Sequence, residues 1–176
     1  LVNSTVDEWM KKLQPAVDWI KAHLEEILAV AAAIGAELLM WKIAKALIPD
    51  LGTIRGDLSK ILSVATAAAT IVVTAALVYE FDNKYMETGK WGYLIADGIA
   101  TALGAYIAGK VVAHSFGTQK GYYTAAATLA ISAGTTLKVV FDHITQAGFD
   151  GKALTASIWA VIKGAAAGGL LAIATG

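Results

Sequence analysis

Four long segments with almost no charged residues follow one another at intervals of about thirty residues, and they limit the possible folds more than any other feature. They cover approximately residues 61–79, 91–109, 121–137 and 153–174. The first has no charged residue over nineteen positions. As a helix it would be about 28 Å long, close to the ~30 Å thickness of the hydrocarbon core of a bilayer. We therefore expect an all-α chain in which residues 51–176 form two Ala/Gly-rich helical hairpins that are transmembrane or membrane-inserting.

The linkers between these segments contain glycine and most of the remaining charge, which predicts turns. We expect the stretch around Phe81, Asp82 and Lys84 to be one such solvated turn. Further turns are expected at residues 89–92, 117–121 and 148–151.

The first fifty residues have a different pattern. Apolar residues recur at three- and four-residue steps from Val6 to Leu28, which predicts an amphipathic helix that Pro15 kinks or divides. From Leu24 to Ile48 the sequence is apolar on nearly all sides, which predicts a buried helix. We treat residues 1–50 as a separate unit of N-terminal helices that lies along a membrane interface or caps the bundle.

The composition gives most of these helices an insertion free energy close to zero between water and lipid. The chain has 35 Ala and 17 Gly among its 176 residues. Eight large aliphatic residues in 61–79 favour insertion by about −2 to −5 kcal/mol. The other three segments have fewer, and Asp97 and Lys163 each offset about 3 kcal/mol if they lie at the centre of a span. We expect these helices to enter lipid as a group rather than singly.

Small residues at four-residue intervals predict flat faces on which another helix backbone can pack closely. Such faces require partners, and further copies of this chain are expected among them. The expected helix-packing residues are Ala156, Ala160, Gly164, Gly168 and Ala172 in one segment and Ala100, Gly104 and Ala108 in another.

Asp97 and Lys163 are the ions that interrupt apolar segments. Three arrangements are open: the two residues pair, they line a polar lumen, or they point to water from a soluble bundle.

Other features argue against an enzyme. Net charge is zero, which excludes a charge-driven nucleic-acid-binding protein, and the chain has no cysteine. The three histidines have no second ligand at helical zinc-site spacing. Residues 104–110 match the glycine and lysine positions of a phosphate-binding loop, but Val111 follows where Ser or Thr is needed. We expect no catalytic residue, metal, cofactor or small-molecule substrate.

The order of features resembles a known family. An amphipathic tryptophan-containing helix precedes the apolar string 25–36, then Trp41-Lys42-Ile43-Ala44-Lys45, and finally Ala/Gly/Thr hairpins with Gly-Lys-Trp-Gly-Tyr at a turn. This resembles the hydrophobic central region of the tail tape measure proteins of long-tailed phages that infect Gram-positive bacteria. The likeness is one of composition and order over most of residues 15–176.

The resemblance implies a helical protein stored in the lumen of the virion tail tube. On infection it would leave the tube and help form a channel for genome ejection across the host cytoplasmic membrane. Its implied partners are the lipid bilayer, further copies of itself, the tail tube and DNA that passes without sequence-specific contact. The first residue, Leu1, is not Met, and we expect a fragment of a longer protein.

Two other readings stay open. One is an integral membrane protein or the helical domain of a pore-forming toxin. The other is a soluble helical interaction domain with an unusually apolar core.

Overall fold

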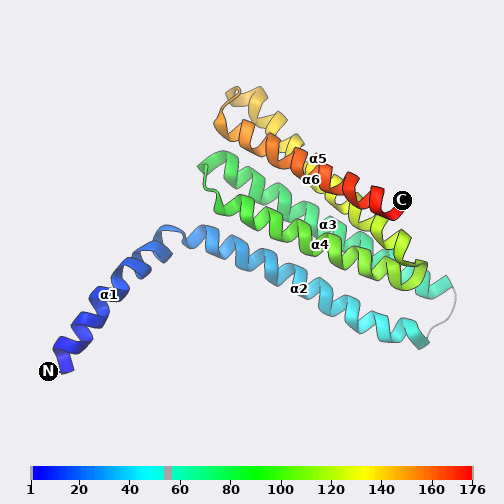
Figure 1. The fold of residues 1–176 in the computed structure, drawn as a ribbon, viewed down its shortest axis with the longest axis horizontal. Coiled ribbons are helices and arrows are strands. Elements are labelled where there is room, and N and C mark those ends of the chain that lie inside the picture. The colour runs from blue at the N-terminus through cyan, green and yellow to red at the C-terminus, as the bar shows by residue number, and fades with distance from the viewer. Residues whose placement is uncertain (1, 54–56, 176) are drawn as a thin grey trace.

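The computed structural model describes residues 2–53 and 57–175 and side chains within 4–47 and 60–175. Every element in these ranges is a helix, as expected (Figure 1). In chain order they are α1 (Val2–Ala22), α2 (Leu24–Thr53), α3 (Asp57–Thr88), α4 (Gly92–Phe116), α5 (Thr118–Ala147) and α6 (Gly151–Thr175).

The two predicted hairpins are present. α3 turns into α4, and α5 turns into α6, through short connections (Figure 1). Gly89, Gly117 and Gly148 have φ values of 72°, 98° and 86°. Residues that have a Cβ atom disfavour positive φ. This explains why a glycine follows each of the helices α3, α4 and α5.

The turn predicted around Asp82 is wrong, because α3 continues as a helix to Thr88. The helix continues because its inward face stays occupied: Phe81, Asp82, Tyr85 and Met86 are all buried, at helical spacing. The polar residues of that stretch, Glu80, Lys84 and Glu87, lie on the opposite, exposed face.

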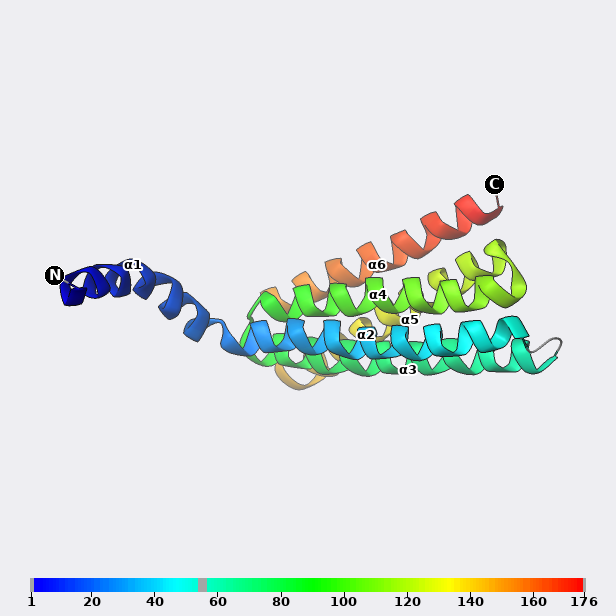
Figure 2. The same cartoon turned by 90° about the horizontal axis from the view of Figure 1, so that it is seen from below.

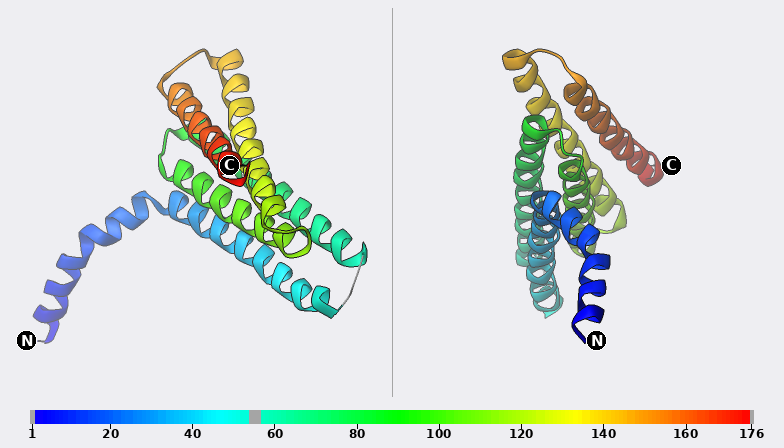
Figure 3. Two further views of the ribbon diagram at one scale, coloured as in Figure 1. Left: turned by 45° about the vertical axis from the view of Figure 1, so that its right-hand side comes forward. Right: turned by 90° about the vertical axis from the view of Figure 1, so that its left-hand side faces the viewer.

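α4 is the central helix of the bundle and packs against α2, α3 and α5 (Figure 3). Its predicted packing residues Ala100, Gly104 and Ala108 are all buried. A Cβ built at Gly104 would overlap the side chain of Thr74 on α3. The missing side chain therefore sets how closely α3 and α4 approach.

α2 belongs to this bundle. Its Ala29 and Ala33 share a core cluster with Phe81, Tyr93 and Val140. The boundary expected at residue 50 falls in the last turn of α2, but α2 and α3 share one core.

α1 extends away from the bundle (Figure 2). Its side chains from Ser4 to Ala22 are exposed, including Trp9 and Trp19. Pro15 lies inside the helix, and the break with α2 comes at His23, whose ring stacks on Trp19. The amphipathic pattern therefore leaves an apolar stripe that the rest of the chain does not cover.

The flat face expected on α6 is only partly formed. Ala156 and Ala160 are buried, whereas Gly164, Gly168 and Ala172 are exposed, so only the first part of the stripe packs within the chain. Residues four apart are offset by about 40° around a helix, so a four-residue series winds around it. The face that α6 buries instead has mixed three- and four-residue steps, at Ala153, Ala156, Ala160, Lys163 and Ala167.

Asp150 caps α6. Its Oδ1 accepts the Ala153 N–H at 2.8 Å, and its Oδ2 lies 3.1 Å from His143 Nε2. The backbone bond, followed by the His143 contact, lowers the pKa of Asp150 below its ordinary value. This cap joins the last turn of α5 to the first turn of α6.

Candidate functional site: a buried ion network

Five helices, α2 to α6, contain stretches that are long and apolar enough to cross a membrane. They are compatible with an integral membrane protein. Most of the charged residues of these helices and their turns lie in two groups at opposite ends of the bundle.

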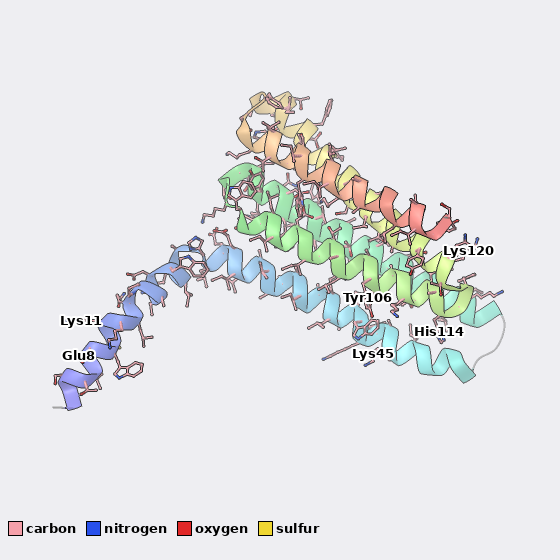
Figure 4. The ribbon with its side chains drawn as sticks, in the orientation of Figure 1. Glu8, Lys11, Lys45, Tyr106, His114 and Lys120 are labelled. Atoms are coloured by element: carbon pink, nitrogen blue, oxygen red, sulfur yellow. The ribbon has the colours of Figure 1, made fainter. Side chains whose placement is uncertain are left out.

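One group surrounds the α3–α4 and α5–α6 turns and is here named the turn end. It contains Glu25, Glu26, Glu80, Lys84, Glu87, Lys90, Lys138, Asp142, Asp150 and Lys152. The opposite group is named the lysine end, and its described members are Lys42, Lys45, Lys60, Lys110 and Lys120. Figure 4 shows Lys45, His114 and Lys120 on three helices at the side of the bundle away from α1.

Aromatic rings accompany the lysine end. The ammonium groups of Lys45, Lys60 and Lys110 lie 5.9, 5.9 and 5.7 Å from the ring centroids of Trp41, Phe116 and Tyr106, respectively. Lysines with apolar stems, together with aromatic residues, are typical of helix ends at a membrane surface.

Between the two ends, the segments 61–79, 91–109 and 121–137 span about 26–28 Å along the helix axes. In this zone the described helices carry four charged residues, Glu37, Asp82, Asp97 and Lys163. Their exposed fractions are 0%, 0%, 0% and 4%, respectively. The zone thus has its charges inside and apolar side chains outside.

Asp97 and Lys163 form an ion pair across α4 and α6. Lys163 Nζ lies 3.0 Å from Asp97 Oδ2 and 3.1 Å from Asp97 Oδ1. Of the three arrangements that the sequence left open, the structure has this pair. Trp159 Nε1 donates to Asp97 Oδ2 at 2.9 Å and Thr101 Oγ1 donates to Oδ1 at 3.3 Å, so the carboxylate is fully engaged.

Helix α5 supplies hydroxyl groups to the same network. Lys163 Nζ donates to Ser132 Oγ at 3.1 Å and to Thr136 Oγ1 at 2.7 Å. Thr136 in turn donates to Asp82 Oδ2 on α3 at 2.5 Å. The network therefore connects four helices, and every one of its polar side chains just named is buried.

A second buried carboxyl lies at the α2–α3–α4 contact. Thr74 Oγ1 donates to Glu37 Oε1 at 2.7 Å, beside the space left by Gly104. Glu37 Oε2 has no hydrogen-bond partner.

Hydroxyl residues line the rest of the α3 interior. Ser63, Thr66, Thr70 and Thr74 are buried at helical spacing. Thr66 and Thr70 donate to carbonyls four residues earlier, at 2.8 and 2.9 Å. Such bonds satisfy hydroxyl groups without water.

Sequence reasoning singled out Asp97 and Lys163 but missed Asp82 and Glu37 as members of buried clusters. A signal existed for Asp82, because it lies eight residues after Thr74 and four after Val78, on one helical face. Glu37 likewise interrupts the apolar run from Leu24 to Ile48.

The chemistry available to the network is charge compensation and proton binding. Within the described residues, His, Asp and Glu do not gather in threes as a metal site would need.

Comparison of the chain with protein-family models, curated proteins and solved structures found no match.

Proposed function

We propose that this chain is a membrane-inserting helical bundle in which α2 to α6 cross the bilayer. One observation carries the proposal: between the turn end and the lysine end, the charged residues of the described helices are all buried, and Asp97 and Lys163 among them form an ion pair. A charge in the hydrocarbon core is stable only when it faces protein or water and has a partner.

The outer surface supports the same conclusion. Val72 on α3, Val161 on α6 and Ile173 on α6 are 67%, 67% and 70% exposed. Many further large apolar side chains face outward on the same helices. A surface of this kind is unfavourable in water and marks contact with lipid or with another protein.

Helix α1 fits a place along the membrane surface. It presents Trp9 and Trp19 together with Lys11, Lys12 and Lys21, and it leaves the bundle at the turn end (Figure 4). An amphipathic helix with tryptophan and lysine binds the interface between headgroups and acyl chains.

The biological setting that we propose is the membrane-active segment of a phage tail tape measure protein. The support is the sequence resemblance together with the near balance of these helices between water and lipid. In this setting the chain is stored in the tail tube and then helps the genome to cross the host cytoplasmic membrane. The bundle interior is filled by side chains, so a DNA-wide channel would form between copies, with DNA passing without sequence-specific contact.

Single cysteines test the membrane position, because the natural chain has none. We expect Val72→Cys and Val161→Cys to react with a membrane-impermeant thiol reagent in detergent-free buffer. Once the protein floats with phosphatidylglycerol-containing vesicles, their reaction should fall at least about tenfold, because lipid covers both positions.

Lys120→Cys and Lys152→Cys are the matched controls, since they lie at opposite ends of the bundle. At least one of them should remain reactive in sealed vesicles, and both should react after the vesicles are opened. If Val72→Cys reacts equally with and without vesicles, the bundle stays in water and the soluble interaction domain is the correct reading.

Channel formation between copies gives a separate prediction. A Cβ at Gly164 or Gly168 meets nothing within 4 Å in the single chain. We therefore expect Gly164→Leu/Gly168→Leu to leave the monomer folded but to reduce dye release from vesicles severalfold, because the flat stripe can no longer approach a second copy.

The matched control for dye release is Val161→Leu/Ile173→Leu, which changes exposed positions on the same helix without filling a glycine. Unchanged release by the glycine variant would exclude the stripe as a contact between copies. Genes for tail tube and portal proteins next to this one would support the phage setting, and their absence from the genome neighbourhood would favour a toxin or an ordinary membrane protein.

A further inference from the structure

Asp82 differs from the other charged members of the ion network. It is 0% exposed, and its Oδ2 accepts the Thr136 hydroxyl. Its Oδ1 is buried and has no hydrogen-bond donor. An unpartnered carboxylate oxygen in a protein interior is strongly unfavourable.

Lys163 does not relieve this situation. An ammonium group has three donors, and Lys163 directs its donors to Asp97, Ser132 and Thr136. Its charge is matched by Asp97. Asp82 therefore has no cation of its own within the network.

The negative charge of Asp97 disfavours a second negative charge on Asp82. An ionised Asp82 would leave two buried negative charges beside one ammonium group, and a proton on one of its oxygens removes the excess charge. The oxygens of Asp97 already accept from Lys163, Trp159 and Thr101, which leaves the orphan oxygen of Asp82 as the place for that proton.

We propose that the network binds one exchangeable proton, held on the orphan Oδ1 of Asp82. With this proton the buried set Asp82, Asp97 and Lys163 has zero net charge, whereas without it the set has one uncompensated negative charge. The charged groups that face Asp82 are Asp97 from α4 and Lys163 from α6, and α5 presents the Thr136 hydroxyl. The inference goes beyond the membrane role and holds in detergent as well as in lipid.

Infrared spectroscopy of the full chain in detergent detects this proton as the C=O stretching band of a carboxylic acid. Glu37 has a second buried carboxyl with an unpartnered oxygen, so the comparison starts from Glu37→Gln. At neutral pH we expect Glu37→Gln to show one carboxylic acid per chain, with a band that shifts in D2O. Glu37→Gln/Asp82→Asn should lose that band completely.

Glu37→Gln/Asp142→Asn is the matched control, because Asp142 is half-exposed and pairs with Lys138 at 2.9 Å. It should keep the band. A heavy-carbon label in the aspartate carboxyl groups provides a second measurement that needs no change at Asp82: the band must move to lower frequency.

Absence of the band in Glu37→Gln at neutral pH, its persistence after Asp82→Asn, or its failure to move with labelled aspartate would each overturn the proton site. These measurements use no bilayer. A negative result therefore leaves the membrane proposal intact, and failure of the cysteine experiment leaves the proton site intact.

Discussion

Replacement of Lys163 by methionine is expected to lower the free energy of unfolding by about 3–5 kcal/mol, because it leaves the Asp97 carboxylate buried without its cation. Methionine has similar length, so the loss reports mainly on charge and hydrogen bonding. Lys163 is 4% exposed and also donates to Ser132 and Thr136, which would lose a donor at the same time. Denaturation in mild detergent, followed by circular dichroism, measures the difference.

Two controls separate the ion pair from other effects of the substitution. Asp97→Asn/Lys163→Met removes both charges and should recover most of the loss, since the amide oxygen still accepts from Trp159 and the amide NH2 can donate to Thr101 Oγ1. Lys138→Met removes a solvent-exposed pair with Asp142 and should leave stability unchanged within error. If Lys163→Met behaves like Lys138→Met, the pair does not hold α4 to α6.

Gly104→Ala is expected to destabilise the bundle by about 1–3 kcal/mol, because the added methyl group has no space. Its Cβ would overlap Thr74 Oγ1 and Cβ, and it would displace the hydroxyl that donates to Glu37 at 2.7 Å. Denaturation in mild detergent measures this loss as well. In a Thr74→Ser background the loss should be smaller, because part of the overlap is relieved.

The matched substitution on α6 should change the free energy of unfolding in the opposite direction. Gly164→Ala meets nothing within 4 Å and replaces a helix-interior glycine. It should therefore stabilise the monomer by about 0.5–1 kcal/mol. Equal effects at Gly104 and Gly164 would contradict the assigned packing of both helices.

Much of the fold could be predicted from local sequence. Uncharged runs bounded by charges and glycines placed four helices in two hairpins, since a long apolar run is stable as a helix and glycine alone adopts the φ values of the turns readily. Prediction was poorest at helix ends. The polar residues that follow Phe81 predict a turn. In the structure, packing of Phe81, Tyr85 and Met86 extends α3 to Thr88.

The site shows the same division. Asp97 and Lys163 could be recognised because each interrupts an apolar segment, but their pairing could not, since they are 66 residues apart in the chain. Asp82 and Glu37 were missed because a buried carboxyl and a solvated one look alike in sequence. Burial depends on which helix covers the residue, and that information is not local.

The helical class, the approximate helix positions and the concentration of charge in the linkers follow from the sequence by itself, because they depend on residue type and on neighbours within a few turns. Only the tertiary structure decided which faces meet. The four-residue stripe of α4 is buried along its length because three helices surround it, whereas the similar stripe of α6 winds away from α5 into the open. The same physical reason applies to Asp82: whether a helical residue is buried is set by the number and direction of the helices around it, which no single segment contains.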